Sequence, residues 1–223
     1  MATIAFISPK GGAGKTTAAL LLALGLNERG RKVALIDSDP NKPLVHWADM
    51  IGRPDGISVH PAPTLQDVSG ALREAQRRQP DWVILDTEGS VRGALAFTTL
   101  RLDMIITPLA GSQLEADQAL KASEMVRQFG IRGGRPMLHR ALLTRIPAAL
   151  RPRLLRQVID QLRAKGMELL PTALIEKEAF RAIFSLGGGF AMLEANGVGG
   201  VAAARANAEA YVEAVLEALG HTQ

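Results

Sequence analysis

The chain has 223 residues, of which 47% are hydrophobic and 22% are charged, as is usual for a globular protein. Cysteine is absent, which excludes disulfides, thiolate zinc sites and iron–sulfur clusters. No run of about 20 apolar residues predicts a transmembrane helix, and the N-terminus lacks the basic start of a signal peptide. We therefore expect a cytoplasmic location.

Short apolar runs alternate with longer amphipathic segments along the chain. The apolar runs predict strands at 3–8, 32–37, 81–86, 103–109 and 137–144, and the segments between them predict helices at 15–29, 64–79, 113–130 and 148–166. An alanine-rich stretch predicts a last helix at 201–219. Three consecutive glycines within 171–190 predict a mobile or tightly turned segment.

Most of the predicted strands are apolar on consecutive positions, which is typical of strands covered on both faces. We therefore predict an α/β fold with a mostly parallel, twisted sheet and helices on both of its faces. No internal repeat or long linker interrupts the pattern, and the first strand begins at residue 3. Residues 1–223 are expected to form a single domain without a DNA-reading domain ahead of it.

A glycine-rich loop stands between the first predicted strand and the first helix. It reads Pro9-Lys10-Gly11-Gly12-Ala13-Gly14-Lys15-Thr16-Thr17, and this strand–loop–helix setting is that of a phosphate-binding loop. The glycines let backbone N–H groups approach phosphate oxygens, and the helix dipole favours the anion. Lys15 is expected to reach the β- and γ-phosphates and Thr16 to bind Mg²⁺. A dinucleotide-binding loop, the closest alternative, would need glycine at position 17.

The loop departs from the standard P-loop pattern because Pro9, followed by Lys10, stands where glycine is expected. The pattern KGGAGKT resembles the deviant Walker A motif of the ParA/MinD family, in which the first lysine is the signature residue. Similarity to short ParA proteins, a group that includes VirC-like relatives, extends through DPNKPLVHWADM and ITPLAGSQLEADQAL over nearly the whole chain. The resemblance implies a P-loop NTPase that binds ATP and Mg²⁺, forms a homodimer around the nucleotide and hydrolyses it slowly without partners.

Lys10 has a physical role in such a dimer. Because Lys15 already serves its own loop, Lys10 is free to point outward and to reach the triphosphate of a second subunit. It would then neutralise developing charge as an arginine finger does. An ordinary surface lysine is the alternative.

Carboxylates follow two of the predicted strands. Asp37 and Asp39 lie at the carboxyl end of the second, and Asp86 ends the third after four apolar residues, as in a Walker B motif. Residue chemistry alone does not order the roles of Asp37 and Asp39. The resemblance implies that Asp39 positions the attacking water and that Asp37 lies near Mg²⁺, while Asp86 would hold a water of the metal. Glu88 is an alternative base.

The resemblance also implies a base pocket and several partners. The segment LLTRIP resembles one beside the adenine, which makes Thr144 and Arg145 candidate pocket residues; for Arg145 a surface ion pair is the alternative. The family moves DNA or protein cargo along the nucleoid, so we expect nonspecific DNA binding, nucleoid association and a ParB-like or other adaptor protein. Plasmid or chromosome partition is the first expectation, and a protein array or a conjugation or T-DNA-transfer complex is the alternative cargo.

The charge distribution supplies candidate DNA contacts. The net charge is +4, but residues 125–167 contain ten basic residues and one acidic residue, a local charge of +9 that leaves −5 elsewhere. This asymmetry predicts a polyanionic partner, and a solvated helix face is the alternative. Candidate contacts are Arg151, Arg153 and Arg156 from this window and, by family resemblance, Lys177 and Arg181.

A MinD-like membrane switch is a third, less favoured interpretation. It would need a basic amphipathic helix at the C-terminus. This chain ends AEAYVEAVLEALGHTQ, with three glutamates on one face and no lysine or arginine. We therefore expect no membrane partner.

Overall fold

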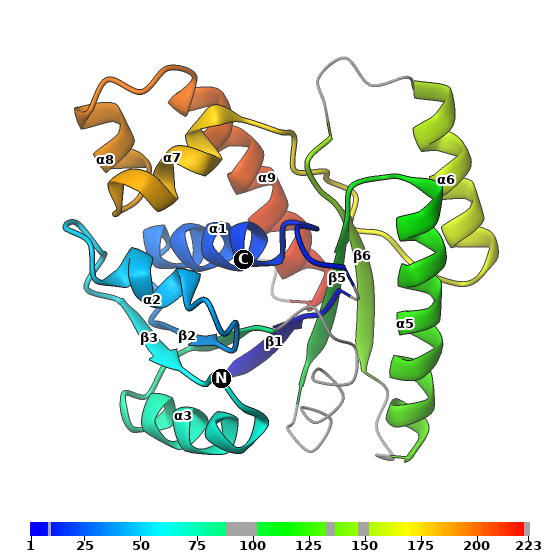
Figure 1. The fold of residues 1–223 in the computed structure, drawn as a ribbon, viewed down its shortest axis with the longest axis horizontal. Coiled ribbons are helices and arrows are strands. Elements are labelled where there is room, and N and C mark those ends of the chain that lie inside the picture. The colour runs from blue at the N-terminus through cyan, green and yellow to red at the C-terminus, as the bar shows by residue number, and fades with distance from the viewer. Residues whose placement is uncertain (9, 88–101, 133–136, 147–151, 221–223) are drawn as a thin grey trace.

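The computed structural model describes residues 1–8, 10–87, 102–132, 137–146 and 152–220 (Figure 1). A six-stranded sheet forms its centre, with the order β3-β2-β4-β1-β5-β6 and every neighbouring pair parallel. The strands are β1 (Ala2–Phe6), β2 (Val33–Asp37), β3 (Ile57–Pro61), β4 (Trp82–Asp86), β5 (Met104–Leu109) and β6 (Leu138–Leu143). The predicted parallel sheet is thus confirmed.

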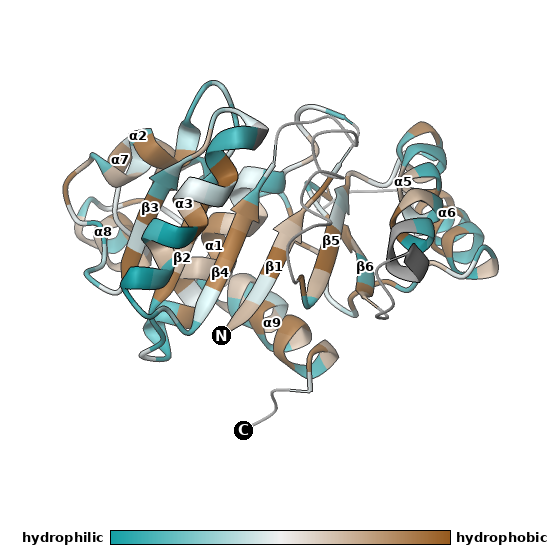
Figure 2. Ribbon diagram, turned by 90° about the horizontal axis from the view of Figure 1, so that it is seen from below, coloured by the Kyte–Doolittle hydropathy of each residue, from teal (hydrophilic) through white to brown (hydrophobic). Residues whose placement is uncertain are grey.

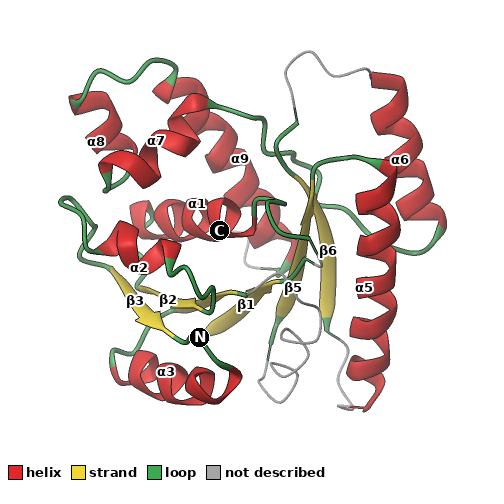
Figure 3. Ribbon diagram, viewed as in Figure 1, coloured by secondary structure: helices red, strands yellow, loops and turns green. Residues whose placement is uncertain are grey.

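Helices cover the sheet on both sides, as the sequence predicts (Figures 1 and 3). They are α1 (Lys15–Glu28), α2 (Pro43–Ala48), α3 (Leu65–Arg77), α5 (Gln113–Arg132), α6 (Pro152–Ala164), α7 (Glu178–Leu186), α8 (Phe190–Ala195) and α9 (Val201–Ala218). Helices α1 and α9 lie against one face and α3 against the other, while α6 packs on α5 beside β5 and β6.

The alternation of side chains along β1 explains the two covered faces. Ile4 and Phe6 belong to the buried cluster that contains α1 and α9, whereas Ala5 and Ile7 belong to the cluster that contains α3. Successive side chains of a strand point to opposite faces, so a strand between two helical layers must be apolar at every position. Figure 2 shows this hydrophobic centre as the brown strands β4 and β5.

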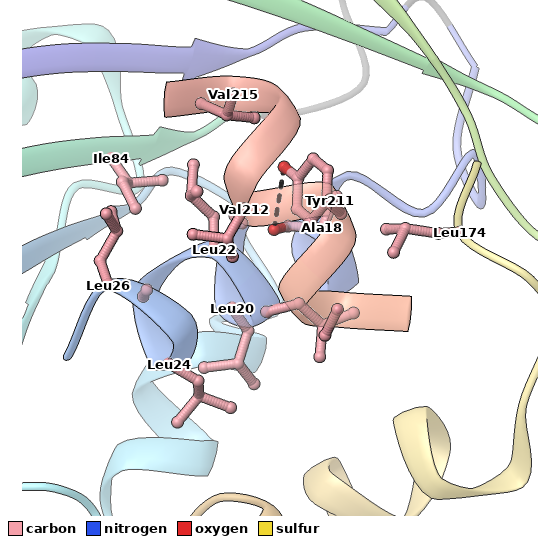
Figure 4. Packing of buried hydrophobic residues seen from close by; sticks show 14 of the residues in the cluster. Ala18, Leu20, Leu22, Leu24, Leu26, Ile84, Leu174, Tyr211, Val212 and Val215 are labelled. Atoms are coloured by element: carbon pink, nitrogen blue, oxygen red, sulfur yellow. Dashed lines mark hydrogen bonds between the residues drawn. The ribbon is translucent and has the colours of Figure 1, made fainter. Parts of the chain in front are cut away.

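Helix α1 is enclosed by the sheet and by α9 (Figure 4). Its residues 18–26 are buried, and the Tyr211 hydroxyl of α9 donates a 3.3 Å hydrogen bond to the Ala18 carbonyl. At Gly25 the two helices are so close that an added Cβ would lie 2.5 Å from Cγ2 of Val212. The helix that follows the glycine-rich loop is therefore fixed along its length.

Four of the described elements, β3, α2, α7 and α8, were not among the strands and helices predicted from the sequence. Helix α7 lies within 171–190, for which the glycines predicted only a mobile or tightly turned segment. Strand β3 was missed because Ser58 and His60 interrupt its apolar character. Among the described strands it pairs with β2 alone, at the edge of the sheet, and such an edge also tolerates Pro61. The short helix α2 was missed too. Its Trp47 is fully buried, and Nε1 donates a 2.9 Å hydrogen bond to the Gly188 carbonyl.

The segment with three glycines is tightly turned. Gly187 and Gly188 have φ angles of 76° and 63°, in the left-handed region that favours glycine. An added Cβ at Gly187 would lie 2.6 Å from the Cβ of Met50. The turn therefore brings α7 and α8 against the loop that follows α2.

Candidate nucleotide-binding site

The glycine-rich loop connects the end of β1 to the start of α1. Gly12 and Gly14 have φ angles of 77° and 84°, and an added Cβ at Gly14 would lie 3.3 Å from Cβ of Thr144. The backbone conformation therefore favours glycine at position 14, where the space for a Cβ is also tight. Within the described residues, the N–H groups of 11–14 donate no hydrogen bond to another protein group, which leaves them available to an anion.

Two side chains from the end of β6 hold this loop by its carbonyl groups. The Thr144 hydroxyl donates a 2.7 Å hydrogen bond to the Ala13 carbonyl, and the Arg145 guanidinium donates a 2.8 Å bond to the Gly12 carbonyl. Arg145 itself has a φ of 52°, which is strained for a residue with a Cβ. The sequence predicted both as base-pocket residues. They line the same pocket, but their hydrogen bonds in the structure brace the loop.

Lys15 is the buried cation of the site. Only 8% of the residue is exposed, and Nζ lies 3.4 Å from the Lys10 carbonyl oxygen. Burial lowers the pKa of Lys15, while the carboxylates of Asp86 and Asp39 act in the opposite direction. A phosphate bound beside this ammonium would supply a negative charge that stabilises the protonated form of the buried Lys15.

Thr16 and Asp86 join the start of α1 to the end of β4. The Thr16 hydroxyl donates a 2.6 Å hydrogen bond to Oδ2 of Asp86, whose pKa is raised to about 7 by burial. Oδ1 of Asp86 is buried and has no hydrogen-bond partner among the described residues. A hydroxyl beside an unsatisfied carboxylate oxygen fits the Thr and Asp pair that holds Mg²⁺ in P-loop enzymes.

The predicted metal is compatible with the residues present. Within the described residues, no group of three or more His, Asp or Glu side chains is placed to hold a metal ion. Mg²⁺ commonly takes one or two protein ligands and completes its shell with phosphate and water. Thr16 as a ligand and Asp86 through water meet that requirement.

Asp37 is paired with Asp86 in the register of β2 and β4, as expected if their carboxylates serve one site. Its oxygens accept hydrogen bonds from three backbone N–H groups: Oδ2 from Leu44 at 2.9 Å and Val45 at 3.1 Å, and Oδ1 from Asp39 at 3.2 Å. Burial raises the pKa of Asp37, against the effect of these donors. Asp37 therefore fixes the start of α2 and the loop that carries Asp39; its place near Mg²⁺ stays a prediction.

Asp39 occupies the wall of the candidate pocket. Its Oδ1 accepts a 2.8 Å hydrogen bond from the Asn41 N–H, which shapes the loop between β2 and α2. Glu88, the alternative base, lies outside the described residues. Among the described residues, Asp39 is therefore the candidate base that lines the pocket.

The pocket itself has a volume of about 400 Å³ and extends from the loop to α7. One end is formed by the loop and Asp39, and the other by apolar and charged side chains of the segment before α7 and of α7. This second group comprises Leu174, Ile175, Glu176, Lys177, Phe180, Arg181 and Phe184. Phosphate-binding groups of the loop, together with a wall of apolar and charged side chains, suit a nucleotide.

The predicted DNA contacts fall into two separate places. Lys177 and Arg181 line the nucleotide pocket, where Arg181 pairs with Glu176 at 3.1 Å. Arg153 and Arg156 are exposed on α6, and within the described residues neither pairs with a carboxylate. Arg151 lies outside the described residues.

Glu115 is the neighbour of Lys10 that the sequence analysis did not identify. Its Oε1 accepts a 2.9 Å hydrogen bond from Lys10 Nζ across 105 positions of the chain. A local signal was present, because Ser112 and Glu115 have the spacing of a capping box at the start of α5. No local pattern, however, links that helix start to Lys10.

The sequence is similar to one protein family over almost its full length. The family model for the VirC1 protein matches residues 1–220. The chain belongs to the VirC1 protein family. This VirC1-family chain is 28% identical over 223 residues to the protein ParA of Rhizobium radiobacter, and the match covers 98% of each. It is 29% identical over 198 residues to maintenance of carboxysome distribution protein A of Halothiobacillus neapolitanus, which covers 83% of this chain and 88% of that protein.

Solved structures share the fold. The ATP complex of a McdA variant from Cyanothece has a TM-score of 0.69 and 18% identity, over 100% of this chain and 98% of that one. The septum site-determining protein MinD of Pyrococcus horikoshii, complexed with Mg-ADP, has a TM-score of 0.67 and 16% identity, over 96% and 95%. The predicted P-loop NTPase fold and the ParA/MinD resemblance are thus confirmed. Among the described residues, no helix is both long and apolar enough to cross a bilayer.

Proposed function

We propose that this VirC1-family chain is a ParA-type ATPase that binds ATP with Mg²⁺, forms a homodimer around two nucleotides and positions DNA through nonspecific binding. Residues 1–223 would act as one unit. The observation that carries this proposal is the pocket at the carboxyl edge of the sheet. There the glycine-rich loop, buried Lys15 and the Thr16–Asp86 pair converge, while Lys10 at the start of the loop stays half-exposed.

The reaction is hydrolysis of ATP to ADP and phosphate. The N–H groups of the loop and Lys15 bind the β- and γ-phosphates, and Asp39 orients the attacking water. Thr16 and Asp86 would hold Mg²⁺, which would supply positive charge to the phosphates during the reaction. Lys10 of the partner subunit then neutralises the charge that develops on the leaving oxygen.

Helix α6 supports the DNA-binding part of the proposal. Arg127 and Arg140 of the basic window pair with Glu124 and Glu168. In contrast, Arg153 and Arg156 are exposed and, among the described residues, without a carboxylate partner. Free guanidinium groups on one surface favour phosphate contacts that read no sequence. Nucleoid association in the cytoplasm and regulation by a ParB-like adaptor follow from the same proposal.

A protein cargo is the second candidate. The similarity to a protein named for the maintenance of carboxysome distribution favours it, because a ParA-type ATPase can carry different cargoes with the same switch. The nucleotide chemistry would be identical in the two cases. A conjugation or T-DNA-transfer complex, the cargo implied by the resemblance to VirC-like relatives, would combine DNA and protein cargo.

The dimer can be tested by sedimentation velocity with a non-hydrolysable ATP analogue and Mg²⁺. We expect the native chain to sediment as a dimer with the analogue and as a monomer without it. Lys10→Ala should remain monomeric with the analogue bound, whereas Lys121→Ala, which removes an exposed lysine of α5, should behave as the native chain. A native chain that stays monomeric at saturation would refute the proposed switch.

A further inference from the structure

The ion pair between Lys10 and Glu115 joins a half-exposed cation to a buried carboxylate. The Lys10 side chain is 48% exposed, whereas the Glu115 side chain is 8% exposed. The lysine stem can swing away from its partner into solvent. The Glu115 carboxylate cannot follow, because it lies in the first turn of α5 and is hydrogen-bonded to the loop between β5 and α5.

Glu115 is fixed by groups other than Lys10. Its Oε2 accepts a 2.9 Å hydrogen bond from the Ala110 N–H and a longer one, 3.5 Å, from the Ser112 N–H. The Ser112 hydroxyl in turn accepts from the Glu115 N–H at 3.3 Å. Although burial acts to raise the pKa of Glu115, hydrogen bonds from Lys10 and Ser112 outweigh it and leave the pKa below its ordinary value. The group is thus an anion at neutral pH.

Departure of Lys10 would not leave Glu115 without partners. A buried carboxylate that loses its only donor is strongly destabilised, but this one keeps the N–H groups of Ala110 and Ser112. The ion pair can therefore open and close at modest cost. This property suits a contact that is exchanged during function.

We propose that Glu115 is a positioning residue that holds Lys10 on its own subunit and releases it when the triphosphate of a partner subunit competes for the ammonium. The inference rests on the face-to-face dimer proposed above. Lys10 carries a single positive charge, so its ion pair with Glu115 and a contact with phosphates held by another subunit compete for the same ammonium. Glu115 thereby sets how much nucleotide-bound protein is needed before the dimer forms.

The size of the effect follows from the exposure of the pair. Because the Lys10 end of the pair is 48% exposed, solvent weakens the attraction, and such pairs change an equilibrium by about two- to fivefold. Since each subunit must release one lysine, the dissociation constant of the dimer changes by the square of that factor, about four- to 25-fold. Glu115→Gln should tighten the dimer by this amount, because the amide keeps an acceptor for the Ala110 N–H but loses the charge that holds Lys10.

The first test measures the dimer dissociation constant with the ATP analogue and Mg²⁺. Glu115→Gln should lower it, and the maximal ATPase rate at saturating protein concentration should stay unchanged. Asp117→Asn is the matched control: it neutralises an exposed carboxylate two positions along α5 that accepts hydrogen bonds from Gln113 and Gln161 and not from Lys10. An unchanged or raised dissociation constant in Glu115→Gln would overturn the proposal.

The second test follows Lys10 in the monomer without nucleotide, and so does not depend on dimerisation. The rate of acetylation of Lys10 by acetic anhydride, read by mass spectrometry against Lys121 in the same chain, should rise in Glu115→Gln. Glu115→Asp, which retains the charge but withdraws it by one methylene, should also raise the rate of Lys10 acetylation. This variant serves as the test if Glu115→Gln folds poorly. Equal reactivity of Lys10 in all variants would show that Glu115 does not hold it. A native chain that fails to dimerise would refute the proposed function and, with it, the release of Lys10 to a partner, but not the retention of Lys10 by Glu115 that this test measures.

Discussion

The Thr16 hydroxyl donates a 2.6 Å hydrogen bond to Oδ2 of Asp86, and this bond ties the first turn of α1 directly to the last residue of β4. The two residues are 70 positions apart in sequence. In the proposed site they would provide one hydroxyl ligand and one carboxylate for a water of the metal. The helix, the sheet and the predicted metal site are therefore built on the same contact.

Removal of either partner should impair turnover more than nucleotide binding. Thr16→Ala and Asp86→Asn are each expected to lower the ATPase rate by at least about 100-fold, because charge stabilisation by the metal is worth several kcal/mol. Thr16→Ser keeps the hydroxyl and should retain most of the activity. Phosphate release at saturating ATP and a Mg²⁺ titration of each variant check this. Full activity in Thr16→Ala would place the metal elsewhere.

Asp39→Asn should separate binding from hydrolysis. The amide oxygen can still accept from the Asn41 N–H, so the loop should keep its shape, while the charge that orients the water is lost. We expect this variant to bind ATP and dimerise, with turnover reduced by about 100-fold or more. Nucleotide binding by fluorescence and phosphate release measure the two properties. Normal hydrolysis would move the role to another residue, with Glu88 the first to examine.

DNA binding should depend on the exposed arginines of α6. In a gel-shift series with ATP at increasing salt, Arg153→Gln with Arg156→Gln should weaken binding and reduce the slope of log K against log salt by about 2, since each lost phosphate contact removes about 0.9. Arg127→Gln is the control, because Arg127 is exposed and already paired with Glu124.

The outcome for α6 also bears on the other candidates. An unchanged affinity and slope in the double variant would exclude α6 and leave Lys177 and Arg181 to be tested. Those two residues line the nucleotide pocket, so their substitution should first change nucleotide affinity. Measuring ATP binding in parallel with DNA binding separates the two effects.

The close approach of α1 and α9 predicts a stability effect. Gly25→Ala places a methyl group 2.5 Å from Val212, whose β-branched side chain has little freedom to move, and should cost about 1–3 kcal/mol of unfolding free energy. Gly70→Ala in α3 meets nothing within 4 Å and should instead stabilise the protein by about 0.5–1 kcal/mol. Urea unfolding of both variants checks the opposite signs; a stabilised Gly25→Ala would show that the helices can separate without cost.

The sequence predicted what depends on residues close together in the chain. The glycine-rich loop, the apolar strands and the long helices α1, α3, α5, α6 and α9 were found because glycine conformation, residue spacing and apolar runs act over a few positions. Asp86 was found for the same reason, since four apolar residues precede it. Strand β3 was missed because polar residues interrupt its pattern, and at the edge of the sheet it has one partner strand, β2.

Tertiary structure decided the contacts between distant segments. Thr144 and Arg145 donate hydrogen bonds to carbonyl groups of the glycine-rich loop. Lys177 and Arg181 line the candidate nucleotide pocket, and Glu115 forms an ion pair with Lys10. Such pairs are set by the order of parallel strands, which brings the ends of β1, β5 and β6 side by side. Hydrophobic periodicity fixes which face of an element is buried, but it carries no information on which other element will cover it.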